Sequence, residues 1–212
     1  MFSRPQIAAV AAEFLGTGLL VMVALILSQT TAVSYFIGTS LAVALAVIVV
    51  LFGSVSGAHV NPALTFGMWT ARKIGTLKGI LYVAAQLLGA LAALELFQYL
   101  ANREMQAKEL AFSTPLFVAE LVGTAVLAVA LAAVVSKKLD TLTSALAMGA
   151  GIFTGVIIAA TASAGYINPA IALGERSWNA VYVLGPLVGG LIGVNLYMWL
   201  FSSEKTKLPW RK

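Results

Sequence analysis

The chain has 212 residues, of which 60% are hydrophobic and only 10% are charged. Soluble domains have about a quarter of charged residues, so this composition excludes an ordinary soluble protein and predicts a polytopic membrane protein. The net charge of +5 does not indicate a nucleic-acid partner, because the basic residues lie in short segments between apolar runs. The absence of cysteine excludes disulfides, thiolate chemistry and thiol-bound metals.

Six apolar runs approach the roughly 20 residues that are needed to cross a bilayer core. In chain order they predict membrane spans at residues 6–28, 35–54, 78–101, 113–135, 143–163 and 180–202. The first run contains Glu13 and exceeds the apolar part of a signal peptide, about 7–15 residues, so it is interpreted as a mature span. Two further segments, at 61–71 and 168–178, reach only about half way across at about 1.5 Å per residue.

Both short segments open with the same tripeptide, at Asn61-Pro62-Ala63 and at Asn168-Pro169-Ala170. Asparagine is among the best N-cap residues, and proline is favoured at the first helical position. Each motif therefore predicts the start of a short helix after a glycine-containing turn. A single copy would be a weak signal, but two copies in matching surroundings are a strong one.

The two halves of the chain repeat. The pattern Ala-Glu-x-x-Gly-Thr occurs at 12–17 and at 119–124, an offset of 107 residues, and Asn61 and Asn168 differ by the same 107. Each half has three spans, an odd number, so the halves must have opposite orientations. We therefore expect one domain, 1–212, made of inverted repeats at about 1–105 and 106–212, an arrangement that places a site at the bilayer midplane.

The basic residues predict the orientation of the chain in the membrane. With a cytoplasmic N-terminus, ten of the 13 lysines and arginines lie inside, and the other three, Arg103, Lys108 and Arg176, lie outside. The first short segment then enters from the cytoplasm and the second from outside, so both Asn-Pro-Ala motifs end near the middle. Irregular backbone at that depth must line a cavity, and the sequence therefore predicts a pore.

At this point the chain resembles the aquaporin, or major intrinsic protein, family over essentially its whole length. The resemblance depends on the paired Asn-Pro-Ala motifs, the residues Ser-Gly-Ala-His at 56–59, the two Ala-Glu-x-x-Gly-Thr patterns and Gln86. It implies an all-α membrane protein with six transmembrane helices plus two re-entrant half-helices, one pore per subunit and a homotetramer. It also implies that Glu13, Glu120 and Gln86 hold the loops before the half-helices, whereas intramembrane carboxylates could otherwise suggest a proton relay.

The predicted function is a passive channel for water and small neutral solutes that excludes ions and protons. Two facing helix N-termini place partial positive charge at mid-pore, about half a charge each. The amide NH₂ groups of Asn61 and Asn168 are expected to be free to donate into the pore, which interrupts a chain of proton-conducting waters. Backbone carbonyls of 57–60 and 164–167 are expected to supply acceptors, among them those of Gly57, Ala58, His59, Ala164 and Tyr166.

The sequence departs from the family pattern at one position of the selectivity filter. The second motif usually continues with arginine, but here the residue is Ile171, and Arg176 lies about 500° further around the helix. Spacing assigns the other filter positions to Leu41, Val156 and Gly165. Such a filter has no side-chain donor. It predicts either weaker discrimination against larger neutral solutes such as glycerol or a pore mouth that is closed because water leaves its apolar wall.

Other functions fit the sequence less well than a channel. A secondary transporter also suits inverted repeats with broken helices, but it would usually carry unpaired charges at mid-membrane. A closed junction or adhesion protein would need more extramembrane area than these loops provide. With one histidine, no cysteine and no nucleophile–base pair, neither an enzyme nor a metal or cofactor is expected.

Three further expectations concern single features. His59 is interpreted as a loop residue rather than a metal ligand or a pH gate, although an unperturbed histidine titrates near pH 6.5. The basic tail, 204–212, is predicted to anchor at the membrane interface. The short tails favour a multi-pass protein of a prokaryotic inner membrane with cytoplasmic N- and C-termini.

Overall fold

The computed structural model describes residues 2–202, and within that range the chain forms eight helices and no strand. Six of them are long and apolar enough to cross a membrane: α1 (Arg4–Thr30), α2 (Ser34–Ser56), α4 (Thr76–Ala101), α5 (Thr114–Lys137), α6 (Thr141–Ala159) and α8 (Ala180–Phe201). The other two, α3 (Pro62–Thr70) and α7 (Pro169–Gly174), are too short to do so. The predicted six spans and two short helices are confirmed, while the predicted interfacial tail lies outside the described residues.

Two predicted helix ends were wrong, both in the second half. Helix α6, predicted to end at 163, ends at Ala159. The Ser163 hydroxyl donates to the Ala159 carbonyl at 2.9 Å. Helix α7 ends at Gly174 instead of 178, because Arg176 adopts a left-handed φ of 55° and the Ser177 N–H donates back to the Ala172 carbonyl at 2.9 Å. Both ends use local hydrogen bonds that satisfy the last carbonyls of a helix.

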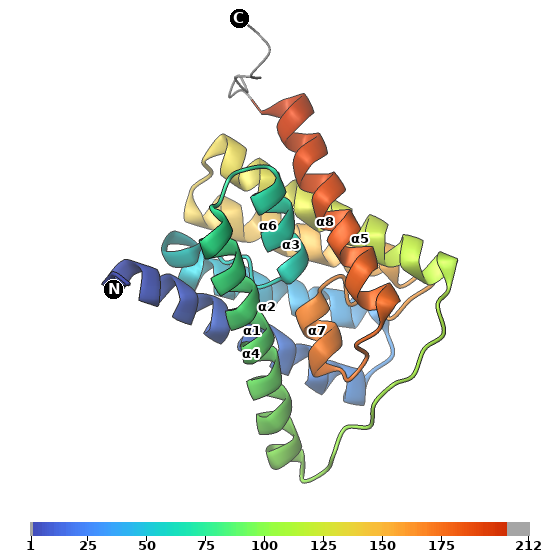
Figure 1. The fold of residues 1–212 in the computed structure, drawn as a ribbon. Helices are drawn as coiled ribbons and strands as arrows, with labels where there is room; N and C mark the ends of the chain where they lie inside the picture. Colours follow the sequence, from blue (N-terminus) through green and yellow to red (C-terminus); the bar gives the residue numbers. More distant parts are fainter. Residues whose placement is uncertain (1, 203–212) are drawn as a thin grey trace, which may run out of the picture.

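Equivalent helices of the two halves make equivalent contacts. Helix α1 packs on α4 as α5 packs on α8, and α1 packs on α2 as α5 packs on α6. The short helices cross over, because α3 packs mainly on α8 of the second half and α7 mainly on α4 of the first. Figure 1 shows α3 and α7 between α4 and α8, and the first residues of both short helices, 62–65 and 169–172, are buried.

Close helix contacts depend on glycine at particular positions. A Cβ atom at Gly189 of α8 would collide with the carbonyl oxygen of Leu121 on α5, and one at Gly155 of α6 would collide with the carbonyl oxygen of Gly123 on α5. Small residues let backbones approach closely, which is the main way in which helices associate within a membrane. Helix α5 is thereby held against both of its neighbours in the second half.

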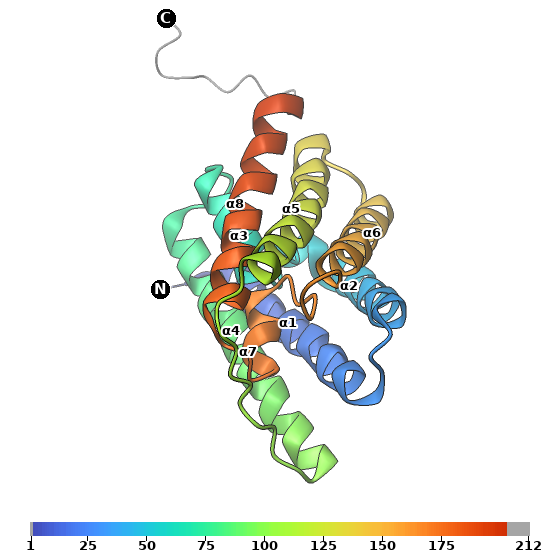
Figure 2. The same cartoon turned by 90° about the vertical axis from the view of Figure 1, so that its right-hand side faces the viewer.

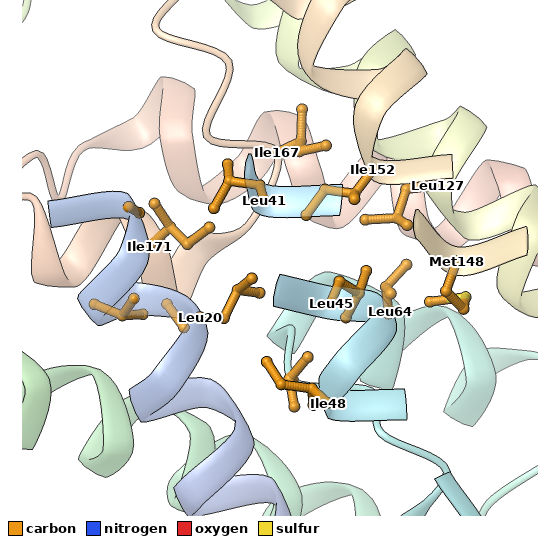
Figure 3. Close-up of a cluster of buried hydrophobic side chains, with 14 of the residues drawn as sticks. Leu20, Leu41, Leu45, Ile48, Leu64, Leu127, Met148, Ile152, Ile167 and Ile171 are labelled. Atoms are coloured by element: carbon orange, nitrogen blue, oxygen red, sulfur yellow. The ribbon is translucent and has the colours of Figure 1, made fainter. Parts of the chain in front are cut away.

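The interior between these helices is apolar (Figure 3). Leu45 and Ile48 of α2, Leu127 of α5 and Ile152 of α6 are each at most 2% exposed. Ile167, in the loop before α7, belongs to the same cluster. The two polar loops that precede the short helices therefore pass through an otherwise hydrophobic centre, where their backbone groups need hydrogen-bond partners.

Candidate functional site

Each short helix begins at its asparagine, as predicted. The Asn61 side-chain oxygen accepts a hydrogen bond from the Ala63 N–H at 2.9 Å, and the Asn168 oxygen accepts one from the Ala170 N–H at 2.9 Å. Both asparagines are extended, and a proline follows each at the first helical position. The cap oxygen is used on the backbone in both copies, which leaves the NH₂ group of each side chain to bind elsewhere.

The two asparagine NH₂ groups bind across the repeat. Asn61 Nδ2 donates to the carbonyl of Ile167 at 2.9 Å, and Asn168 Nδ2 donates to the carbonyl of Val60 at 3.0 Å. All four residues are at most 1% exposed. The expectation that both NH₂ groups are wholly free was wrong, because each uses one of its two N–H bonds on the opposite loop. One N–H of each amide remains.

The loops before the short helices adopt left-handed backbone at matched positions. Ala58 and Gly165 have φ of 46° and 70°, and Val60 and Ile167 have φ of 41° and 43°. For β-branched residues such a φ is a genuine outlier. Strain of this kind persists only where surrounding contacts hold it in place, and two buried carboxylates provide those contacts.

Glu13 of α1 binds the first loop. One carboxylate oxygen accepts from the Ser56 hydroxyl at 2.6 Å and from the His59 N–H at 3.0 Å. The other accepts from the Val60 N–H at 2.7 Å and from the Gln86 amide at 2.8 Å. Glu13 is 0% exposed, and four donors share its negative charge, so the loop is fixed to α1 and α4 by charge-assisted hydrogen bonds.

Glu120 of α5 binds the second loop in the same way, with one donor fewer. It accepts from the Ser163 hydroxyl at 2.7 Å, the Tyr166 N–H at 3.0 Å and the Ile167 N–H at 2.6 Å. The second half has Pro186 at the position that corresponds to Gln86, and proline has no side-chain donor. The scaffold is therefore symmetric in its backbone contacts and asymmetric in its side chains.

His59 lies in the first loop with its ring buried. Its Nδ1 atom is 3.2 Å from the Thr65 hydroxyl, and its ring packs edge-on against Tyr82 with centroids 5.5 Å apart. Thr65 also accepts from the Gln86 amide at 2.8 Å. Among residues 2–202, no three histidine, cysteine or acidic side chains are grouped as metal ligands would be.

The loop carbonyls named from the sequence differ from the two that bind asparagine. In the described part of the chain, no donor binds the carbonyl oxygens of Gly57, Ala58, His59, Ala164 or Tyr166. Gly57 and Ala164, at matched positions of the two loops, are exposed, whereas Ala58 and His59 are buried. Each loop therefore leaves acceptors for a molecule other than the protein.

A cavity of about 310 Å³ lies beside the second loop. Three of the four predicted filter residues, Leu41, Gly165 and Ile171, line it. The fourth, Val156, does not, but its carbonyl oxygen lies 3.2 Å from where a Cβ on Gly165 would be. Leu41, Val156 and Ile171 are 3%, 1% and 1% exposed, so the three predicted filter residues with side chains are buried and aliphatic.

The same cavity has a charged side chain that the sequence analysis did not place there. Lys108, between α4 and α5, lines it together with Tyr166 and Glu175, and its Nζ lies 2.9 Å from Glu175 Oε2. The four predicted filter residues carry no side-chain donor themselves, and Lys108 adds one to the cavity that three of them line. Arg176 is exposed and does not line this cavity. The available signal was Glu175, a carboxylate in an apolar segment, which requires a cation from the outer loops.

The comparison with known families decides the identity of the chain. The family profile described as "Major intrinsic protein" matches residues 2–197. The chain belongs to this family. It is a passive membrane channel for water and small solutes, which confirms the function predicted from the paired motifs.

Individual relatives agree with this assignment. This family member is 34% identical over 181 residues to a probable aquaporin TIP-type from Medicago truncatula, covering 79% of this chain and 72% of the relative. It is 30% identical over 178 residues to aquaporin-4 from Dipodomys merriami, covering 76% and 54%. Its fold matches the X-ray structure of the aquaglyceroporin from Plasmodium falciparum with a TM-score of 0.75 at 21% identity, covering 91% and 95%.

Proposed function

We propose that water and small uncharged solutes, including glycerol, cross this channel between the two loops, and that ions and protons are excluded. The observation that carries the proposal is the pair of reciprocal hydrogen bonds from Asn61 to Ile167 and from Asn168 to Val60. They bring two amide donors from opposite halves to one point inside the bundle. A transport path through a symmetric repeat is expected at such a point.

The remaining N–H of each asparagine suits a water molecule in transit. A water oxygen that accepts from both Asn61 and Asn168 has its hydrogens directed away from both amides, so it cannot accept a proton from the next water. The unbound carbonyls of Gly57, Ala58, His59, Ala164 and Tyr166 would receive those hydrogens on either side. Partial positive charge at the start of the half-helices adds to the dehydration penalty of a cation.

The filter and the scaffold complete the proposed path. Leu41, Val156, Gly165 and Ile171 form an apolar constriction that binds solutes weakly and therefore releases them fast. Glu13, Glu120 and Gln86 keep the loops in their left-handed conformation, as their hydrogen bonds support. Pro62, Ala63, Pro169 and Ala170 are buried and present the helix starts to each other.

Charge and surface support a placement of the chain in the membrane. The two inverted repeats, about 1–105 and 106–212, form one domain in a cell inner membrane, with both termini in the cytoplasm. The excess of basic residues on the cytoplasmic side supports this orientation. Exposed apolar side chains on the long helices, such as Val43, Val47 and Leu146, suit contact with lipid and with neighbouring subunits of a homotetramer.

Stopped-flow light scattering on proteoliposomes tests this function. Under a sucrose gradient, and then under a glycerol gradient, flux should exceed that of empty vesicles, rise linearly with the gradient and need no ion gradient. Flux that saturates and depends on an ion gradient would indicate a secondary transporter. Flux equal to that of empty vesicles for both solutes would indicate a closed structural protein.

A further inference from the structure

The outer cavity has one polar wall, which is built from two distant segments. The Lys108 Nζ atom lies 2.9 Å from Glu175 Oε2 and 3.3 Å from the Tyr166 hydroxyl. The Lys108 backbone N–H also donates to the Arg176 carbonyl at 2.8 Å. Figure 2 shows that the segment between α4 and α5 passes alongside α7. Main chain and side chain together hold Lys108 at the end of α7.

This wall has unused hydrogen-bonding capacity. An ammonium group has three donors, and the two contacts of Lys108 use two of them. The Lys108 side chain is 45% exposed, so the third donor is accessible. Glu175 is only 1% exposed, and its Oε1 atom is buried with no hydrogen-bond partner among residues 2–202. A buried acceptor without a partner is unfavourable, and this one belongs to a residue that lines the cavity.

The charge of Lys108 is secure at this site. Burial lowers the pKa of Lys108, but the hydrogen bonds and charges of Glu175 and the Tyr166 hydroxyl raise it by more, so the pKa lies above its ordinary value. The ammonium form therefore persists at physiological pH. This charged group differs from the predicted constriction, which contains only aliphatic side chains and Gly165.

We propose that Lys108, held in place by Glu175, is a specificity-determining residue of this channel that receives a neutral solute carrying hydroxyl or amide groups at the outer mouth. The inference rests on the proposed function. Ile171 supplies no donor beside the second motif, and Lys108 reaches the same cavity from a different segment. A polyol or urea gives up several hydrogen bonds to water before it enters the apolar constriction, and the free donor of Lys108 replaces one of them.

The test compares glycerol, urea and water fluxes in proteoliposomes of the full chain. Lys108→Met removes the donor and keeps an unbranched side chain, and we expect it to lower the glycerol-to-water permeability ratio about tenfold, the effect of one charge-assisted hydrogen bond. Lys108→Arg keeps charge and donors and should stay within about twofold of the unmodified protein. Arg103→Met removes the same charge from the same loop, away from the cavity, and should leave the ratio unchanged.

Each outcome has a definite meaning. An unchanged or increased ratio in Lys108→Met overturns the inference, as does an equal loss in Arg103→Met. If Lys108→Met does not fold because Glu175 is left unpaired, Lys108→Met with Glu175→Gln removes both charges and must show the same lowered ratio. If the unmodified protein passes water but neither glycerol nor urea, the inference fails and the water channel stands. If it passes no water, the proposed function fails first.

Discussion

Replacing Asn168 with alanine tests the contact between the two loops most directly. The change removes a helix cap, which is worth about 1 kcal/mol. It also removes a hydrogen bond of about 1 kcal/mol and leaves the buried Val60 carbonyl without that partner, at about 1 kcal/mol more. The expected loss in the free energy of unfolding is therefore about 3 kcal/mol. Asn179→Ala is a matched control, because Asn179 is half-buried, caps α8 and donates only within its own segment, to the Ser177 carbonyl at 3.0 Å.

The assay is reversible unfolding in mixed detergent micelles, followed by circular dichroism, with water flux measured on the same preparations. Asn179→Ala should cost about 1 to 1.5 kcal/mol, because water can replace its partner at a half-buried site. It should leave water flux per folded channel unchanged, whereas Asn168→Ala should alter it. Equal destabilisation by the two variants would refute the reasoning, since it would mean that the bond across the repeat contributes nothing.

Three further predictions concern the path itself. Ile171→Arg puts a larger side chain into the predicted constriction and narrows it, so it should lower the glycerol-to-water flux ratio at least about fivefold, which corresponds to about 1 kcal/mol; an unchanged ratio would show that Ile171 does not line the constriction. Asn168→Asp adds a negative charge at mid-path and should raise proton or potassium leak in a dye-quenching assay; a leak equal to that of the unmodified protein argues against a pore position. Because the pKa of Lys108 is raised, its contribution is complete below the ordinary lysine value of about 10.4 and is lost only as the pH rises through the higher folded value. Solute flux should therefore be flat from about pH 5 to 9, and an inflection assigned to Lys108 in that window would contradict the ion pair.

The starts of the short helices were predictable because Asn-Pro has one strong local meaning, a cap followed by a first helical residue. The partner of each asparagine NH₂ was not predictable. It is a carbonyl whose direction depends on left-handed backbone at Val60 and Ile167. β-branched residues disfavour that conformation, so local sequence rules argue against the geometry that the carboxylates of Glu13 and Glu120 impose.

The fold was predictable to the level of six spans and two short helices, since span length and repeat spacing are properties of the whole sequence. The polar wall of the cavity was not. Lys108 and Glu175 are 67 residues apart, and a lysine in an irregular loop follows no period that could indicate its partner. The carboxylate of Glu175 indicates that its partner is one of the three basic residues expected outside. Only the folded chain shows which of the three it is.

The two hydrogen bonds that the asparagine side chains make across the repeat also constrain how the protein folds during synthesis. The N-terminal half leaves the ribosome first, and at that stage Asn61 lacks the carbonyl of Ile167 and the carbonyl of Val60 lacks Asn168. Each half therefore lacks a hydrogen-bond partner that only the other half supplies. The two loops can therefore bind each other only late in folding. A nascent chain that stalls before Asn168 carries the unpaired Asn61 amide and Val60 carbonyl into the lipid.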